Sequence, residues 1–190
     1  MFLKTKPEFL KSKIHKACDT KSVRRALEYL YFKDGKVVAT EAHILLEQDL
    51  IECHGFSKEQ VKLLDDKLLH ANDAKILDNC TDIEVFSDRI EGFIKKTDVR
   101  VTCKLKPNGF DEKYVNYKNI VHLQGEGKLS SVGINPYLLQ KVVDCMYGTK
   151  EERSSLQLSF MSPSQRILVT TKGDLPSVQY AIVMPINLID

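Results

Sequence analysis

The chain has 190 residues, of which 43% are hydrophobic and 28% are charged, values that are typical of an ordinary globular protein. This length allows a substantial core and lies between one large domain and two small ones. The formal net charge of +2 is too small to indicate a nucleic-acid partner by itself. No apolar run approaches the roughly 20 residues that a membrane-spanning helix needs, so no membrane association is expected.

The cysteines indicate the redox environment of the chain. They are odd in number, widely spaced and form no C-x-x-C pair: Cys18, Cys53, Cys80, Cys103 and Cys145. No signal peptide is recognisable, so the pattern favours a soluble, cytoplasmic protein with reduced thiols. No second Cys or His lies at zinc-ligand spacing from Cys53 and His54, and we expect neither a metal site nor a cofactor.

Residues 1–25 form the basic cluster of the chain, with eight Lys or Arg residues against two acidic ones. Apolar residues recur there at helical spacing from residue 10 to residue 18, which predicts an amphipathic helix flanked by Lys13 and Lys16. Two interpretations remain open from the residues alone. The helix is either a solvated surface helix or one that lies against a phosphate backbone.

From residue 25 the apolar period changes to two, which predicts strands at 27–32, 36–40 and 43–46, with Asp34-Gly35 as a hairpin turn. Two short helices are predicted next. Ser57 and Gln60 match a capping box for a helix that runs through residues 61, 64 and 68. Asn72 or Asp73 is expected to cap a helix over residues 74–80, with Ile76 and Leu77 directed inward.

The rest of the chain repeats the pattern. Strands are predicted at residues 83–86, 89–95 and 99–105, and Pro and Gly residues interrupt the connection that follows. A strand at 129–134, a helix at 137–147 capped by Asn135 and Pro136, and three strands at 156–160, 166–171 and 179–184 complete the prediction.

A unit of one helix followed by three strands thus occurs three times, in residues 1–50, 67–105 and 129–186. We expect an α+β fold in which antiparallel sheets carry their helices on one face. The predicted organisation is a domain at 1–110, a connector at 111–128 and a half-domain at 129–190. The sheet edge of the half-domain requires a partner, which suggests a homo-oligomer.

The last eleven residues have two interpretations. Residues 180–184 read as a strand, and Pro185 marks its end because proline cannot donate to a ladder. Either the segment only closes the core, or the residues after Val183 line an apolar groove that receives a ligand.

Five stretches resemble the bacterial sliding clamp, the beta subunit of DNA polymerase III. Residues 23–27 and 38–45 are similar to part of the clamp's middle domain, where the second stretch reads Val-Ala-Thr-Asp-Gly-His-Arg-Leu. Residues 113–120 resemble the segment Arg-Phe-Pro-Asp-Tyr-Arg-Arg-Val that leads into the last clamp domain. Residues 133–139 and 180–188 resemble Gly-Phe-Asn-Val-Ser-Tyr-Leu and the C-terminal Tyr-Val-Val-Met-Pro-Met-Arg-Leu.

The resemblance implies a DNA-clamp-like fold of about one and a half clamp domains, with the sheet outside and helices lining a DNA-sized hole. It also implies a pocket for short peptide motifs of DNA polymerase and other clamp-motif proteins. By residue match, the pocket comprises Leu27, Thr40, Ala42, His43, Leu45, Val115, Ile120, Ile182, Met184, Pro185, Ile186 and Leu188. Three positions differ from the family's motifs. Ala42 replaces the Gly before His, Ile44 replaces the Arg after His, and Asn187 replaces the Arg after Met-Pro-Met, so two positive charges at the pocket rim are lost.

The same resemblance favours the phosphate-binding interpretation of the basic cluster, because clamp helices face the hole. The expected non-specific contacts to double-stranded DNA are Lys6, Lys11, Lys13, Lys16, Arg24, Arg25 and Lys141. The alternative is a clamp-fold protein-interaction module that does not bind DNA.

An enzyme is the least supported interpretation. We do not expect Glu41 and His43 to act together as an acid and a base. Neither a Gly-rich phosphate loop nor a G-x-S-x-G elbow occurs in the sequence. We therefore expect a non-enzymatic scaffold.

Overall fold

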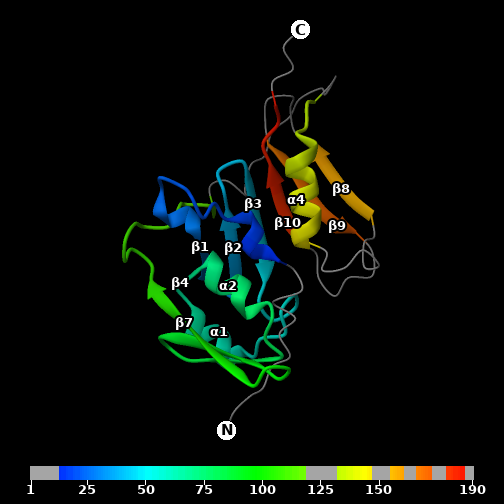
Figure 1. The fold of residues 1–190 in the computed structure, drawn as a ribbon. Coiled ribbons are helices and arrows are strands. Elements are labelled where there is room, and N and C mark those ends of the chain that lie inside the picture. Colours follow the sequence, from blue (N-terminus) through cyan, green and yellow to red (C-terminus); the bar gives the residue numbers. More distant parts are fainter. Residues whose placement is uncertain (1–12, 119–131, 147–154, 161–165, 173–178, 187–190) are drawn as a thin grey trace.

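The computed structural model describes residues 13–118, 132–146, 155–160, 166–172 and 179–186. Within these residues, ten strands form one antiparallel sheet in the order β5-β6-β7-β4-β1-β2-β3-β10-β9-β8 (Figure 1). The strands are β1 (Tyr29–Lys33), β2 (Lys36–Thr40), β3 (Ile44–Asp49), β4 (Lys67–His70), β5 (Asp82–Val85), β6 (Arg89–Ile94), β7 (Val99–Pro107), β8 (Ser155–Phe160), β9 (Ile167–Lys172) and β10 (Tyr180–Val183). The helices are η2 (Ile14–Ala17), η3 (Arg25–Glu28), α1 (Lys58–Leu64), α2 (Ala71–Leu77) and α4 (Pro136–Met146). The α+β prediction, with antiparallel strands, is confirmed.

The hairpin between β1 and β2 forms where the sequence predicts it. Asp34 and Gly35 have φ values of 51° and 77°, as a two-residue turn with two left-handed positions requires. β1 begins two residues later than predicted, because Arg25–Glu28 form the 3-10 turn η3. The backbone N–H of Leu27 donates to the carbonyl of Arg24 across 3.0 Å in this turn.

The capping box of α1 is also confirmed. The Gln60 N–H donates to Ser57 Oγ (3.3 Å), and the Ser57 N–H donates to Gln60 Oε1 (2.9 Å). The helix ends at Leu64, however, and residues 67–70 form β4 rather than a further helical turn. Leu68 and Leu69 are both buried on opposite faces of the sheet, and a short run with two buried faces has no strand-like alternation. β4 is an additional strand at the start of the predicted second unit, in which one helix, α2, is followed by the three strands β5, β6 and β7.

α2 begins three residues earlier than predicted. Its N-cap is His70, whose Nδ1 accepts the Asn72 N–H at 3.1 Å, so the predicted cap at Asn72 or Asp73 is wrong. Leu77 is buried as expected, whereas Ile76 is 44% exposed and does not point inward. The three strands β5 to β7 lie close to their predicted positions.

The last unit continues the sheet of the first. β10 pairs with β3 along its length, with Ile182 opposite Leu45, and β9 and β8 follow. Asn135 Oδ1 accepts the Tyr137 N–H at 3.0 Å at the start of α4, as the predicted cap requires. In residues 132–134 there is only one isolated bridge, between Gly133 and Ile186, instead of the predicted strand; residues 129–131 lie outside the described part.

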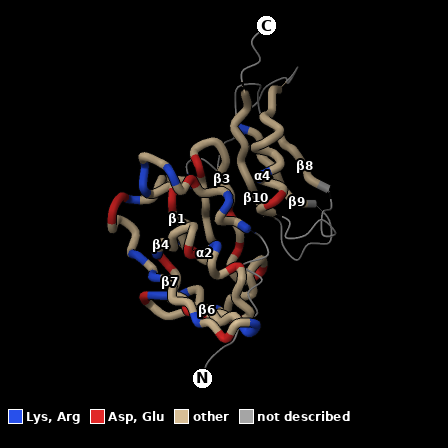
Figure 2. Tube along the Cα trace, in the orientation of Figure 1, with Lys and Arg blue, Asp and Glu red and all other residues tan. Residues whose placement is uncertain are grey.

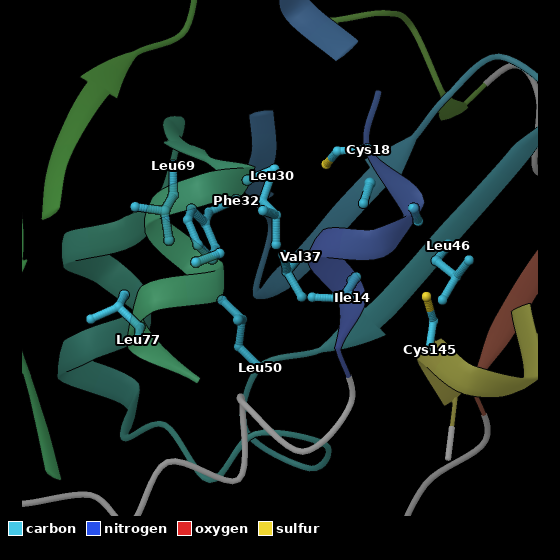
Figure 3. Close-up of a cluster of buried hydrophobic side chains, with 14 of the residues drawn as sticks. Ile14, Cys18, Leu30, Phe32, Val37, Leu46, Leu50, Leu69, Leu77 and Cys145 are labelled. Carbon is cyan, nitrogen blue, oxygen red and sulfur yellow. The ribbon is translucent and has the colours of Figure 1, made fainter. Parts of the chain in front are cut away.

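The main core lies between the sheet and the helices (Figure 3). Leu30, Phe32 and Leu46 of the sheet pack there with Ile14 of η2 and Cys145 of α4. The predicted amphipathic helix is short: η2 has four residues, and Lys13 before it is left-handed at φ 48°, so no helix runs through Lys13. Ile14, Ala17 and Cys18 are buried as the apolar stripe predicts.

Two buried glutamines tie α4 to the sheet. Gln48 Nε2 of β3 donates to the carbonyl of Cys145 (3.2 Å) and to Gln179 Oε1 (2.6 Å). Gln179 Nε2 donates to the carbonyl of Met146 at 3.0 Å. Both amides therefore satisfy carbonyl groups in the last turn of α4, which have no partner within the helix.

The opposite face of the sheet carries a smaller apolar cluster. Tyr29, Tyr31 and Leu45 pack there against Ala26 of η3 and Tyr114, and Val38, Leu68, Tyr117 and Ile182 complete the cluster. Residues of the sequence-predicted connector therefore cover this face near β1 to β3. Within the described ranges, no helix has the length and apolar character that crossing a membrane requires.

Candidate functional site

A cavity of about 200 Å³ opens on the face of the sheet that carries the smaller cluster. Its wall is predominantly apolar and consists of Arg24, Leu27, Thr40, Ala42, His43, Ile44, Leu45, Val115, Ile182 and Met184. These residues come from η3, from β2 and β3 with their connection, from the segment after residue 110 and from the end of β10. Four distant stretches of the sequence thus meet at one site.

The β2–β3 connection forms one wall. Thr40 Oγ1 donates to the carbonyl of Ile44 at 2.7 Å and accepts the N–H of Ala42 at 3.2 Å. Ala42 has a φ of 77°, in the left-handed region that favours glycine. The Met184 N–H donates to the carbonyl of His43 at 3.0 Å, so the pairing of β3 with β10 extends into this wall.

The end of β10 forms the other wall. Ile182 is buried opposite Leu45, whereas Met184, two residues further along, is 36% exposed at the rim. Ile186 is 45% exposed, and its N–H donates to the carbonyl of Gly133 at 2.9 Å. The segment after β10 is thereby held to the chain just before α4.

The structure brings together eight of the twelve residues that the clamp resemblance placed in one pocket: Leu27, Thr40, Ala42, His43, Leu45, Val115, Ile182 and Met184. Pro185 and Ile186 follow Met184 directly but are not part of the cavity wall. Ile120 and Leu188 lie outside the described residues.

Sequence reasoning missed two residues of the wall, Arg24 and Ile44. We predicted Arg24 as a phosphate contact, but it lines the cavity three residues before Leu27. A 3-10 turn has three residues per turn, which places positions i and i+3 on the same side. The three-residue spacing of Arg24 and Leu27 would therefore have indicated that Arg24 lines the same cavity as Leu27, had the 3-10 turn been predicted.

The predicted phosphate contacts do not form one surface. Lys13 precedes η2 and Lys16 lies in it, on the helix face of the sheet. Arg24 precedes η3, Arg25 begins it, and both line cavities on the opposite face. Lys6 and Lys11 lie outside the described residues. In the described part of the chain, Lys and Arg are interspersed with Asp and Glu along the trace (Figure 2).

Two of the predicted cations have intramolecular carboxylate partners. Lys141 pairs with Glu41, and only 15% of each side chain is exposed, so Lys141 is poorly placed to reach a phosphate. Lys16 Nζ lies 3.8 Å from Asp144 Oδ2 on α4, and the two side chains are 40% and 32% exposed. Lys75, which is exposed on α2, is a cation of the same face that sequence analysis did not select.

A partly buried pair lies between η2 and the end of α2. His15 Nδ1 is 3.1 Å from Asp78 Oδ2. Burial, together with the charges of Lys16, Lys75 and Lys13, lowers the pKa of His15 to about 4. Burial raises the pKa of Asp78 to about 7. Between about pH 4 and pH 7 the pair therefore holds one proton, on Asp78, and both side chains are uncharged.

The thiols of the core are not activated. Burial raises the pKa of the Cys103 and Cys145 thiols to about 12 and that of Cys18 still further. These thiols remain neutral, and a thiol is a weak nucleophile and metal ligand. Among the residues described, no group of three or more His, Cys, Asp or Glu side chains is arranged to hold a metal ion.

Comparison with known proteins identifies the fold. No family model and no curated protein sequence matches the chain. Solved bacterial sliding clamps match almost its whole length. The Helicobacter pylori beta clamp in complex with diflunisal aligns over 98% of this chain and 66% of its own, with a TM-score of 0.66 and 15% identity.

Two further structures agree. The Borrelia burgdorferi DNA polymerase III subunit beta, in complex with a natural product, aligns over 99% of this chain and 64% of its own, with a TM-score of 0.62 and 11% identity. The Pseudomonas aeruginosa sliding clamp bound to griselimycin aligns over 99% of this chain and 66% of its own, with a TM-score of 0.58 and 14% identity. The chain therefore has the sliding-clamp fold and spans about two thirds of the length of these clamps.

Proposed function

We propose that this chain is a non-enzymatic, sliding-clamp-like scaffold that binds short hydrophobic segments of partner proteins and associates with double-stranded DNA. In this proposal, residues 1–110 act as a clamp domain, 111–128 as a connector and 129–190 as a half-domain, and the chain works in the cytoplasm. The observation that carries the proposal is the apolar cavity, because β10 of the half-domain and β2–β3 of the domain each supply part of its wall.

The chemistry of the cavity fits an apolar peptide anchor. Leu27, Leu45 and Ile182 supply aliphatic surface, and burial of an apolar side chain there is favourable in proportion to its area. Met184 at the rim is flexible and adapts its shape to more than one side chain. A few such anchors provide most of the affinity of a short peptide.

The test is a fluorescence-polarisation assay with labelled hexapeptides that carry two neighbouring apolar residues, taken from Leu, Ile, Met and Phe. Wild-type protein should bind members of this set, and Met184→Ala should weaken binding at least about fivefold because it removes the rim of the cavity. Tyr180→Ala is a matched control, since Tyr180 is on the same strand, 41% exposed, and outside the cavity. Unfolding of the Met184→Ala variant would instead show that this segment stabilises the core.

DNA association is proposed through the helix face. Lys13, Lys16 and Lys75 lie around η2 and α2 and are suited to non-specific phosphate contacts. Affinity for duplex DNA should fall steeply with salt, and Gln at all three positions should reduce the slope of log K against log salt by about 0.9 per lost contact. Arg25→Gln, on the opposite face, should leave the slope unchanged.

The alternative, a clamp-fold interaction module without DNA binding, has an observation of its own. Asp78 and Asp144 lie on the same face as the lysines, and Lys16 is already near Asp144. Both functions predict peptide binding, and only the first predicts a steep salt slope. Absence of duplex binding near 50 mM salt would leave the interaction module as the function.

We also propose that copies of the chain associate through the half-domain. Of the strands in the described part, β8 lies at one end of the sheet and has one unpaired edge. Such edges readily pair with another strand. Light scattering at micromolar concentration should give a mass above that of one chain, and a strict monomer would contradict this part of the proposal.

A further inference from the structure

An imidazole and a carboxyl group meet on the helix face, beside the lysines proposed to contact DNA. His15 belongs to η2, and Asp78 directly follows the last residue of α2. Their Nδ1 and Oδ2 atoms lie 3.1 Å apart, and only 12% and 19% of the two side chains are exposed. The pair therefore joins the two helical segments that carry these lysines.

Three exposed lysines surround the pair. Lys13 and Lys16 lie on either side of His15 in the sequence, and Lys75 precedes Asp78 by one helical turn. The positive charges of all three act on both members of the pair. A change in the charge of the pair is consequently felt at each of the proposed phosphate contacts.

The other elements packed against η2 and α2 add few charges near the pair. On α4, Asp144 lies 3.8 Å from Lys16, and Lys141 pairs with Glu41. Burial raises the pKa of the nearby Cys80 thiol, which therefore stays neutral. The strands behind the two helices present apolar side chains of the main core.

The pair changes its charge near neutral pH. Burial raises the pKa of Asp78 to about 7, against the opposing effect of the lysines, and lowers the pKa of His15 to about 4. Between these values both side chains are uncharged. Above about pH 7 the carboxyl group is an anion beside a neutral imidazole, so the helix face gains one negative charge.

We propose that the His15–Asp78 pair makes the association of the helix face with duplex DNA depend on pH, and that this association weakens when the pair loses its proton. The proposal rests on the proposed DNA association and adds a regulation to it. Phosphates bound at the surrounding lysines disfavour a further anion among them, so bound DNA makes Asp78 hold its proton more tightly. By linkage, binding takes up a proton near neutral pH and becomes weaker as pH rises.

The experiment measures the affinity of the full chain for a labelled duplex of mixed sequence at about pH 6 and about pH 8.5, near 50 mM salt. Wild-type affinity should be about fivefold lower at the higher pH. Asp78→Asn, which is uncharged throughout, should match wild type near pH 6 and bind about fivefold more tightly than wild type near pH 8.5. Asp144→Asn removes an exposed carboxylate beside Lys16 and is the matched control, which should keep the pH dependence of the wild type.

Circular dichroism at both pH values checks that each protein is folded. Carbon-13 NMR of the aspartate carboxyl groups tests the wild type without a substitution, because the titration midpoint of Asp78 should rise when duplex is added. Duplex binding that is equal at both pH values, or whose pH dependence survives in Asp78→Asn, overturns the inference while the proposed DNA association stands. If no duplex binds at either pH, the proposed DNA association falls and the inference falls with it.

Discussion

Glu41 and Lys141 form an ion pair that links the β2–β3 connection to α4, with 15% of each side chain exposed. Glu41 directly precedes Ala42 and His43, which line the cavity on the other face of the sheet. The pair therefore fastens the wall of the cavity to the helix of the last unit. It also removes Lys141 from the set of cations that are free to meet a phosphate.

Replacement of Lys141 by Met should destabilise the protein by about 2 kcal/mol, because it leaves the Glu41 carboxylate largely buried without a counter-charge. Urea unfolding measures this loss. The double variant Glu41→Gln, Lys141→Met should recover most of it, since no unpaired charge remains. If both variants are as stable as the wild type, the pair does not anchor the wall.

Ala42→Gly should stabilise the protein by about 1 kcal/mol. Ala42 has a φ of 77°, and a Cβ in this conformation is strained whereas glycine is not. The same change at Ala74, which is buried in the helix α2, should destabilise by about 1 kcal/mol or more. Thermal or urea unfolding of the two variants in parallel provides the measurement, and a loss of stability in Ala42→Gly would contradict the strain argument.

Gly92→Ala should destabilise the fold by about 2 kcal/mol. A Cβ on Gly92 of β6 would lie 2.3 Å from Cys80 Sγ, 2.9 Å from Val101 Cγ2 and 3.0 Å from Leu77 Cδ2. The strand and α2 must therefore separate to accommodate one methyl group. Adding Cys80→Ala removes the nearest atom and should restore part of the stability, which a comparison of urea midpoints tests.

The His15–Asp78 pair predicts an unusual pH dependence. The pKa of His15 is 6.5 in the unfolded chain and about 4 in the folded one. Considered alone, His15 therefore lowers the stability of the fold as pH falls from 6.5 to 4. The pKa of Asp78 is 3.8 in the unfolded chain and about 7 in the folded one. Its contribution to the stability of the fold is therefore lost as pH rises from 3.8 to 7. Between pH 4 and 6.5 the folded and unfolded pairs each bind one proton, and the two effects cancel.

Asp78→Asn removes the compensating group. Relative to wild type, this variant should lose about 1 kcal/mol more stability between pH 6.5 and 5.5, since one unit of pH corresponds to about 1.4 kcal/mol for one proton. Urea midpoints at the two pH values give the difference, with Asp144→Asn as the control that leaves the His15–Asp78 pair intact. Identical pH dependence in wild type and Asp78→Asn would show that the pair does not share a proton in this way.

Much of the fold follows from local signals. The turn at Asp34 and Gly35, the capping box at Ser57 and Gln60, and the strands with clear alternation are confirmed. The sequence did not predict β4, because Leu68 is buried on one face of the sheet and Leu69 on the other. Two adjacent buried residues do not show the alternation of apolar and polar residues by which a strand is recognised. Eight residues that the resemblance placed in one pocket line one cavity, and Arg24, which was predicted as a phosphate contact, lines it too.

The sequence by itself determined the β1–β2 hairpin, the helix caps at Ser57 and Asn135 and the strands with clear alternation, because these depend on the conformational preferences of a few neighbouring residues. Only the tertiary structure decided which face of the sheet each charged residue occupies. Lys16 and Arg24 are eight positions apart in one basic cluster, yet the sheet lies between them. Burial of apolar side chains on both faces fixes that arrangement, and no local pattern of charges carries the information.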